Sequence, residues 1–464
     1  MLSNSVWGVI SNIVQNVLLS VFFVMMVRSY SKLDFADYII ANTVYSFILG
    51  FSSLGLGYWF IREVLTSTDK KRLVQQFFKM QLIIGVVFYL LNTLICCLLY
   101  ADPIIQKLSA IIGINIIFDN IIYVIKYLNI AEQQQKKSSI LLMVEALLKC
   151  GIGVILFFTP INLILLVLLL IGLRFFTLNL FIKYGSAEAL SLKEIIKTPI
   201  SFQHFKTIIG ANWSFVIIGS LSIVNWRIGN IIVSKFLSLA DVSNYEVSFK
   251  LLSLAYILPV IVSSAILPVL INKHKTHWLD LQQFYKAAFI LFALFGLLSF
   301  TFVQSFSNFF VPLLFGEHYT DTVQYCNEMF LVMLVFPTVL IQANVLITIK
   351  LEKIDMICNL VGLLTNVVLC IVGLYFYKNL SVINYAIFIS FIVFHIIQDI
   401  VLVKNKITNF KHVLLFYIIS IALILGFFTT ATYCNPLLHF ILYWMIVAML
   451  VWFFCRKEIL HFFK

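Results

Sequence analysis

The sequence predicts an all-α protein that crosses a membrane many times. Of its 464 residues, 62% are hydrophobic and 11% are charged, and the mean hydropathy is +1.03. A water-soluble core of this size would leave far more apolar side chains than it could cover. Apolar runs recur along the whole chain, each long enough to cross about 30 Å of hydrocarbon as a helix. The short alternating segments of a membrane barrel do not occur.

These runs predict about fourteen transmembrane helices. The first run has no basic segment before it and no small-residue cleavage site after it, so it is interpreted as a spanning helix rather than a cleaved signal peptide. Prolines at 103, 160 and 436 mark tight turns, because proline is tolerated in the first turn of a helix but not farther in. The expected helices cover residues 6–28, 36–60, 74–100, 103–126, 138–158, 161–182, 207–235, 244–271, 284–310, 323–349, 355–377, 381–403, 412–432 and 435–455.

The distribution of basic residues predicts the orientation. Of the 32 Lys and Arg residues, twenty-three fall in loops after even-numbered helices or at the C-terminus, five in loops after odd-numbered helices, and four inside spans. The positive-inside rule therefore places both termini in the cytoplasm. The net charge of +12 follows from this topology and from attraction to anionic membrane lipids, so it does not indicate nucleic-acid binding.

The four cations inside spans are candidate functional residues, because a charge near the bilayer centre costs about 2.5–3.5 kcal/mol on insertion scales. Lys149 has Glu145 four residues earlier, and Lys250 has an acidic residue at the same spacing, so ion pairs within the helix are the simpler interpretation. Arg174 is expected to reach the cytoplasmic interface with its long side chain. Arg227 has no acidic residue three or four positions away, so it is expected to face water, another helix or a ligand.

Polar residues at helical spacing indicate an aqueous path through the protein. Each one alone is explained by a hydrogen bond between packed helices. Their concentration on the first and seventh predicted helices favours a cavity. The predicted lining residues are Asn12, Gln15, Asn16, Asn230, Asp119 and Asn366.

A short repeat predicts two halves. Residues 33–38 and 240–245 share an Asp and a Tyr at an offset of 207 positions, and Asp34 and Asp241 are each expected to cap the incoming helix. Both copies fall at equivalent points in successive sets of six helices. The halves are therefore expected to be parallel, with substrate between them. The predicted units are an N-terminal six-helix bundle over 1–182, a cytoplasmic linker over 183–206, a second six-helix bundle over 207–403, and two additional helices over 404–464.

No motif indicates an enzyme, a cofactor or a metal site. A Walker A sequence does not occur, and His274 and His277 lack the Glu of a metalloprotease. His395 and Asp399 are expected to form a structural hydrogen bond rather than a proton-linked pair. The eight cysteines form no CxxC and are interpreted as packing thiols.

Longer segments carry a family resemblance. They are YSKLDFADYIIANTVYSFILGFSSLGLGYWFIRE at 30–63, IIVSKFLSLADVSNYEVSFKLL at 231–252, AILPVL at 265–270, VPLLFGEHYTDTV at 311–323, and Glu352-Lys353 before a helix with Asn366. Together they resemble the polysaccharide-transporter branch of the multidrug/oligosaccharidyl-lipid/polysaccharide (MOP) exporter superfamily, close to the O-antigen flippases called Wzx. The Asp that is common in this family at the start of the 231 run is replaced by Gly229 and Asn230.

This resemblance implies movement of undecaprenyl-diphosphate-linked sugar units, as for lipopolysaccharide O-antigen, from the inner to the outer leaflet of a bacterial cytoplasmic membrane. The implied partners are the lipid-linked oligosaccharide, membrane lipids, and a polysaccharide polymerase and chain-length regulator. A diphosphate needs desolvated cations, which Arg227 and Lys250 would supply, with Arg28 near the outer mouth. Rocking of the two halves would move the headgroup without covalent chemistry.

Two alternatives stay open. A multidrug antiporter of the same superfamily would be expected to line its cavity with carboxylates, whereas the predicted lining is cationic apart from Asp119. A membrane polysaccharide polymerase or ligase would be an enzyme with a large outer loop, whereas the outer loops predicted here are short.

Overall fold

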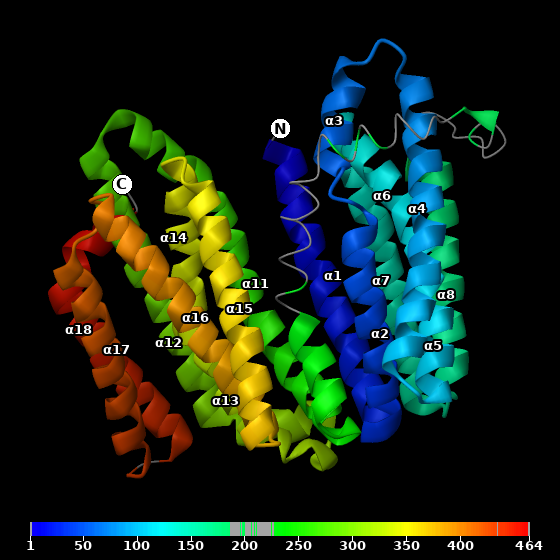
Figure 1. Cartoon of the computed structure of the whole chain (residues 1–464). Helices are drawn as coiled ribbons and strands as arrows, with labels where there is room; N and C mark the ends of the chain where they lie inside the picture. The colour runs from blue at the N-terminus through cyan, green and yellow to red at the C-terminus, as the bar shows by residue number, and fades with distance from the viewer. Residues whose placement is uncertain are drawn as a thin grey trace. The chain divides into compact units, whose positions relative to one another are not determined.

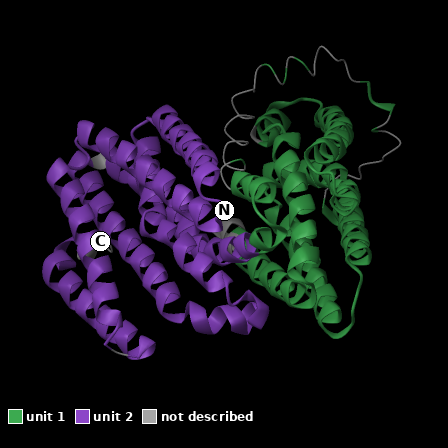
Figure 2. Ribbon diagram, turned by 60° about the horizontal axis from the view of Figure 1, so that its bottom comes forward, with its two compact units in different colours: residues 1–243 green, residues 244–464 purple. Residues whose placement is uncertain are grey.

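The computed structural model describes residues 2–185, 227–433 and 435–462, with isolated positions between 195 and 224. No strand occurs among these residues, and twelve of their helices are long and apolar enough to span a membrane. The all-α, polytopic class is therefore confirmed. Two compact units, Met1–Ser243 and Asn244–Lys464, make up the chain and are called the first and second unit (Figure 2).

The first unit contains eight α-helices and a short π-helix among the described residues up to 185 (Figure 1). They are α1 (Leu2–Ser29), α2 (Lys32–Ser52), α3 (Gly57–Thr66), α4 (Lys70–Leu99), α5 (Pro103–Gly113), α6 (Asn115–Ala131), α7 (Gln135–Phe158), α8 (Leu163–Leu180) and η1 (Phe181–Gly185). Residues 227–236 are helical as well, and α11 (Leu239–Thr276) begins in this unit.

The second unit contains most of α11 and the rest of the chain. Its helices are α12 (Trp278–Phe315), η2 (Glu317–Tyr319), α13 (Thr322–Met329), η3 (Phe330–Leu334), α14 (Phe336–Thr348), α15 (Glu352–Phe376), α16 (Leu380–Lys404), α17 (Phe410–Ala431) and α18 (Pro436–Phe462). Within this unit α15 packs on α16, and α12 packs on α14 and α18.

Aromatic and aliphatic side chains form the core of the first unit. Phe60 of α3 stacks on Phe77 of α4 with ring centroids 4.2 Å apart, and Leu56 and Val124 are fully buried in the same cluster. The outward faces are apolar too: the side chains of Leu98 and Phe158 are 76% and 77% exposed. The outer faces of the helices are therefore as apolar as the core. An exposed apolar surface of this extent is typical of a protein that contacts the lipid of a bilayer.

Three predicted helices are interrupted. The helix expected over 36–60 is broken between α2 and α3, where Leu54 and Gly55 have positive φ angles of 50° and 60°. The one expected over 103–126 divides into α5 and α6 at Gly113 and Ile114. The one expected over 323–349 divides into α13, η3 and α14. The prediction of continuous helices was wrong at these places.

Pro337 explains the third break. A proline has no N–H to donate to the carbonyl four residues earlier, which here is the carbonyl of Met333. That oxygen faces Gly296 of α12 so closely that a Cβ added to Gly296 would clash with it. The interrupted segment therefore packs backbone against backbone on α12.

The repeated motif forms the same cap twice, although the expected capping residue was wrong. Ser31, not Asp34, caps α2: its Oγ accepts from the Asp34 N–H at 3.1 Å and donates to the Asp34 carboxylate at 2.7 Å. At the offset of 207, Ser238 Oγ accepts from the Asp241 N–H at 3.2 Å and donates to its carboxylate at 2.6 Å. In the second copy the Ser238 N–H also donates to the Asp241 carboxylate at 3.1 Å, so this aspartate holds the third helical position of a capping box.

Part of the predicted organisation lies outside the described residues. This holds for most of the linker over 183–206 and of the helix over 207–235. The units divide after Ser243, inside α11, and the count of fourteen helices and the domain bounds stay predictions.

Candidate functional site

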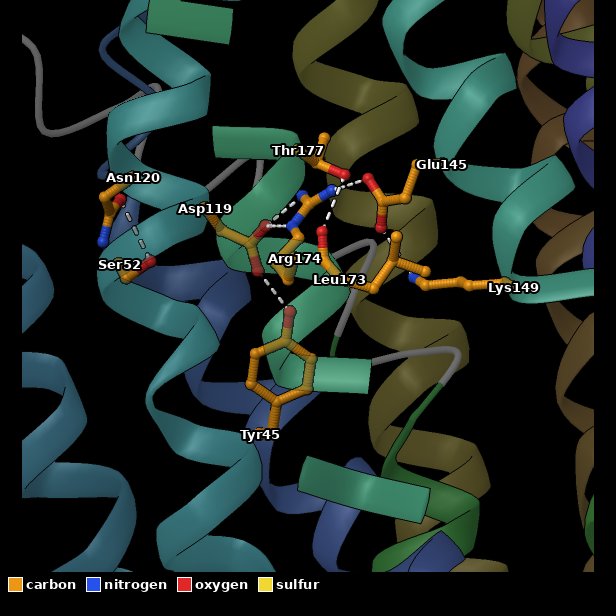
Figure 3. Close-up of polar contacts among 9 residues, drawn as sticks. All are labelled: Tyr45, Ser52, Asp119, Asn120, Glu145, Lys149, Leu173, Arg174 and Thr177. Atoms are coloured by element: carbon orange, nitrogen blue, oxygen red, sulfur yellow. Dashed lines mark hydrogen bonds and ion pairs between the residues drawn. The ribbon is translucent and has the colours of Figure 1, made fainter. Parts of the chain in front are cut away.

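A charge network joins four helices of the first unit. The guanidinium of Arg174 on α8 lies between the carboxylates of Asp119 on α6 and Glu145 on α7 (Figure 3). Its Nε donates to Asp119 Oδ1 at 2.7 Å, and its two terminal nitrogens bond Asp119 and Glu145. Lys149 Nζ lies 2.8 Å from Glu145 Oε1, and the hydroxyl of Tyr45 on α2 donates to Asp119. These five residues are called the charge network below.

Local sequence explains how the network forms. Glu145 and Lys149 are four residues apart on α7 and so share one helix face. Arg174 is the only cation in an otherwise apolar stretch of α8, and it lies midway along the span Leu163–Gly185. From that depth it meets Asp119 and Glu145, which also lie near the middle of their spans Pro103–Ala131 and Gln135–Phe158.

Because the charge network is buried, removing one of its members is expected to be costly. The side chains of Asp119 and Glu145 are 9% and 5% exposed, and that of Arg174 is 19% exposed. In such surroundings the loss of one partner leaves an uncompensated charge, which costs about 3–5 kcal/mol. The network holds two cations and two carboxylates, so it is balanced. Its chemistry suits holding α2, α6, α7 and α8 together in the membrane.

The structure confirms one expectation about the buried cations and corrects another. The ion pair between Lys149 and Glu145 is present. The expectation that Arg174 reaches the cytoplasmic interface was wrong, because its guanidinium is engaged by two carboxylates at mid-span. No pattern in the sequence pointed to Tyr45. The shared depth of Asp119, Glu145 and Arg174 in their spans was a usable signal.

The predicted site residues on α1, all within the described part of the chain, make no hydrogen bond or ion pair with this network. On α1, Asn12 is exposed, while Gln15 and Asn16 are half-buried, and Asn16 Nδ2 donates to the Asn12 carbonyl at 2.8 Å. Arg28 is exposed in the last turn of α1. Asp119, another predicted lining residue, belongs to the charge network. Their role in lining a cavity stays a prediction.

The helical segment 227–236 carries two further candidates. Arg227 is half-buried and Asn230 is buried. The segment is fixed to the end of α4 through Tyr100: the Tyr100 hydroxyl lies 2.6 Å from Ser234 Oγ, and the Lys235 ammonium lies 4.1 Å from the centre of the Tyr100 ring. A cation over an aromatic ring is held by the ring's negative face.

Two candidates lie in the second unit. Lys250 is half-buried on α11, and Asn366 of α15 is buried, with Oδ1 accepting from Cys370 Sγ at 3.3 Å. Arg28 and Arg227 belong to the first unit and Lys250 to the second, and their joint contact with one headgroup stays a prediction.

Another expected polar contact occurs in the second unit. His395 Nδ1 lies 2.9 Å from Asp399 Oδ2 and 2.7 Å from the Tyr417 hydroxyl, and Gln342 donates to the other Asp399 oxygen at 2.7 Å. The histidine is fully buried. The expected hydrogen bond between His395 and Asp399 is therefore present and joins α14, α16 and α17.

Solved structures share this fold at low sequence identity. An inward-facing multidrug resistance MATE family transporter of the MOP superfamily aligns with a TM-score of 0.70 and 12% identity, over 84% of this chain and 94% of that one. The lipid II flippase MurJ, in an inward closed conformation, aligns with a TM-score of 0.67 and 15% identity, over 97% and 99%. The MATE multidrug transporter DinF-BH gives a TM-score of 0.57 and 13% identity, over 87% and 95%.

A family comparison covers more than half of the chain. No curated protein matches. The family model described as "Polysaccharide biosynthesis protein" matches residues 25–324. This range runs from the end of α1 into α13 and includes the charge network. The chain therefore belongs to the polysaccharide biosynthesis protein family and has the fold of the MATE and MurJ transporters of the MOP superfamily.

Proposed function

We propose that the protein is a flippase for lipid-linked oligosaccharide. It moves undecaprenyl-diphosphate-linked repeat units of a surface polysaccharide, such as O-antigen, from the inner to the outer leaflet of a bacterial cytoplasmic membrane. The observation that carries the proposal is the conjunction of two matches: a polysaccharide biosynthesis family over residues 25–324, and the fold of a lipid flippase over nearly the whole of both chains. The reaction needs no covalent chemistry, only transfer of a polar headgroup.

The headgroup would be held by cations. A diphosphate forms short, charge-assisted hydrogen bonds with guanidinium and ammonium groups. Arg227 suits this role because it is half-buried on a helical segment that Tyr100 holds in place. Lys250 and Arg28 are the proposed additional contacts, while the polyprenyl tail stays in lipid.

The charge network would keep part of the first unit rigid during transport. Alternating access by rocking requires that helices within a unit move together. Arg174 is bonded to α6 and α7 at once, and Tyr45 adds α2 through Asp119. We infer that these four helices move as one body.

A multidrug antiporter is the second candidate, since MATE transporters share the fold. Cationic drugs would need carboxylates that are free to bind them. In the first unit, the buried carboxylates of Asp119 and Glu145 are already neutralised by Arg174 and Lys149. This pairing favours an anionic cargo over a cationic one. A polymerase or ligase is less well supported, because the shared folds are those of transporters.

Gene deletion with complementation tests the proposal in cells. The deletion strain is expected to accumulate lipid-linked repeat units that an impermeant glycosidase cannot reach from the periplasmic side, and to lose surface glycan. Restoration by a plasmid copy shows that the loss is specific. Surface glycan that persists in the deletion strain, with no accumulated precursor, would contradict the proposal.

A polymerase and a chain-length regulator are the proposed partners at the outer face.

A further inference from the structure

A cavity of about 900 Å³ opens in the second unit, and its described lining includes none of the charge-network or predicted headgroup residues. Most of the lining comes from four helices. Gln304 and Asn308 lie one turn apart on α12, Gln324 and Asn327 on α13, and Phe428 close to the end of α17. Tyr385 near the start of α16 completes this set. The volume falls within the range of about 300–1,000 Å³ that small-molecule sites occupy.

Amide groups face this cavity with hydrogen-bonding capacity to spare. Gln304 Nε2 donates to the Asn327 carbonyl at 3.0 Å, which leaves the Gln304 side-chain oxygen open. Asn327 Oδ1 accepts from Ser307 at 2.8 Å, which leaves its NH₂ group open. Asn308 is exposed and makes no side-chain hydrogen bond within the described parts of the chain. The cavity thus presents both donors and acceptors.

A buried carboxylate fixes this arrangement. Glu328 is 7% exposed and accepts from Ser381 at 2.8 Å, from Asn384 at 3.0 Å and from Gln324 at 2.9 Å. These bonds tie α13 to α16 and orient Gln324 at the cavity. A site whose side chains are held by neighbours in advance loses less entropy on binding.

The chemistry of the lining fits a sugar. Side-chain amides match neighbouring hydroxyls of a pyranose, because each amide offers a donor beside an acceptor. The rings of Tyr385 and Phe428, which are 46% and 47% exposed, offer apolar faces for the C–H side of a sugar ring. The described lining includes the acidic Asp321 and Glu328 and no Lys or Arg, so it disfavours a diphosphate.

The expected topology puts this cavity at the outer membrane surface. Lys286 lies near the expected cytoplasmic start of α12, and Gln304 is eighteen positions farther along the same helix. At 1.5 Å per residue these span about 27 Å, close to the thickness of the hydrocarbon layer. Gln304 and Asn308 are then expected where a headgroup sugar meets water.

We propose that this cavity, called the amide pocket, binds sugar units of the lipid-linked oligosaccharide at the outer leaflet. The inference rests on the proposed function for the identity of the glycan. The chemistry by which the pocket would recognise a sugar does not depend on the proposed function. Neutral amides would bind hydroxyls, aromatic faces would contact C–H groups, and the described lining has no cation for phosphate. The pocket would hold the sugar end of the cargo apart from the diphosphate.

Binding of a lipid-free glycan tests the proposal. The full chain is placed in nanodiscs of phosphatidylethanolamine and phosphatidylglycerol. The probe is the oligosaccharide released by mild acid from the producing cell's own lipid-linked precursor. Calorimetry and saturation-transfer NMR are expected to show binding that Gln304→Leu/Asn308→Leu weakens by roughly tenfold or more, because two hydrogen-bonding groups are lost. Phe309→Leu, on the same turn but 71% exposed outside the pocket, is expected to bind like the parent.

The outcomes separate this proposal from the proposed function. Equal binding by the parent and the double variant would overturn the amide pocket, and so would displacement of the glycan by inorganic pyrophosphate. Translocation of the intact lipid-linked oligosaccharide is measured separately in proteoliposomes. If the parent translocates but does not bind glycan in this pocket, the pocket fails and the function stands. If glycan binds there but no translocation occurs, the pocket stands and the function fails.

Discussion

At the scale of single residues, Arg174 is the most tightly engaged cation among the described residues of the first unit. Arg174→Ala would leave Asp119 and Glu145 without this cation at mid-span. We expect a loss of about 3–5 kcal/mol in the free energy of unfolding, because stranded buried charges are costly. Thermal denaturation in detergent and the amount of protein in membranes measure it. The control is Arg62→Ala, whose exposed pair with Glu63 at 3.3 Å contributes little. Equal stability of both variants would contradict the assignment.

Replacing Lys149 tests which of the two cations is the more important partner of Glu145. Lys149→Ala removes one partner of Glu145, but Glu145 also bonds Arg174. We therefore expect a smaller loss than for Arg174→Ala, because Glu145 keeps one cation, although the network is left with two carboxylates and one cation. The same denaturation measurement compares the two. A larger loss for Lys149→Ala would show that the lysine, not the arginine, is the main partner of Glu145.

Arg227 tests the proposed headgroup contact. Arg227→Ala is expected to abolish surface glycan while the protein inserts at normal abundance. Arg227→Lys is expected to retain part of the function if charge alone is needed, and less if the diphosphate requires the two parallel donors of a guanidinium. Surface glycan and protein abundance are measured together in a complemented deletion strain. Normal export by Arg227→Ala at normal abundance would place the headgroup site elsewhere.

At the scale of elements, one close approach explains why a predicted helix is broken. Pro337 removes the donor that would bond the Met333 carbonyl, and Gly296 lets α12 approach that oxygen. Gly296→Ala would drive a Cβ into it, so we expect the segments to separate at a cost of about 1–3 kcal/mol. Gly151→Ala on α7 is the control, since nothing lies within 4 Å of its added Cβ. The thermal stability of both variants in detergent tests this expectation. If Gly296→Ala is as stable as Gly151→Ala, the packing account is wrong.

The sequence predicted where most helices begin and end, but it did not predict where three of them are interrupted. Hydropathy located the helix from 355 to 377 within a few residues of α15, because an apolar run must match the bilayer. The break at Gly55 is a left-handed turn between α2 and α3, and Pro337 stands in the first turn of α14. The close approach of the Met333 carbonyl to Gly296 depends on the packing of α12. A residue pattern along one run carries no information about a partner helix.

At the scale of the whole molecule, the repeated capping motif is the observation behind the prediction of two parallel halves. Ser31 and Ser238 each accept a hydrogen bond from the N–H of the aspartate three residues later, at an offset of 207 positions. The relation of the two halves stays a prediction.

Long-range pairing was the part of the site that sequence could not predict. Lys149 and Glu145 are neighbours on one helix, so their spacing predicted the pair. Arg174 is 29 residues from Glu145 and 55 from Asp119, and only the packing of α6, α7 and α8 brings them together. Hydropathy gives each helix and the depth of its charged residues, but not its rotation or neighbours, so it could not show which charges form pairs.

The basic loops of the chain predict its orientation in the membrane. Lys193→Cys in the predicted cytoplasmic linker is expected to escape an impermeant thiol reagent in intact cells, in a background whose native cysteines are replaced. Lys378→Cys, in the exposed turn between α15 and α16, is the matched control and is expected to react. Reaction at position 193 in intact cells would overturn the predicted topology.

Translocation by the purified protein tests the flippase proposal most directly. Proteoliposomes carry a lipid-linked oligosaccharide that is first confined to the inner leaflet, and an impermeant glycosidase outside reports its arrival. The protein is expected to expose the oligosaccharide to the enzyme far faster than protein-free liposomes do, and Arg227→Ala is expected to remove this acceleration. Exposure at the same rate with and without protein, in vesicles where correct insertion is verified, would contradict the proposed function.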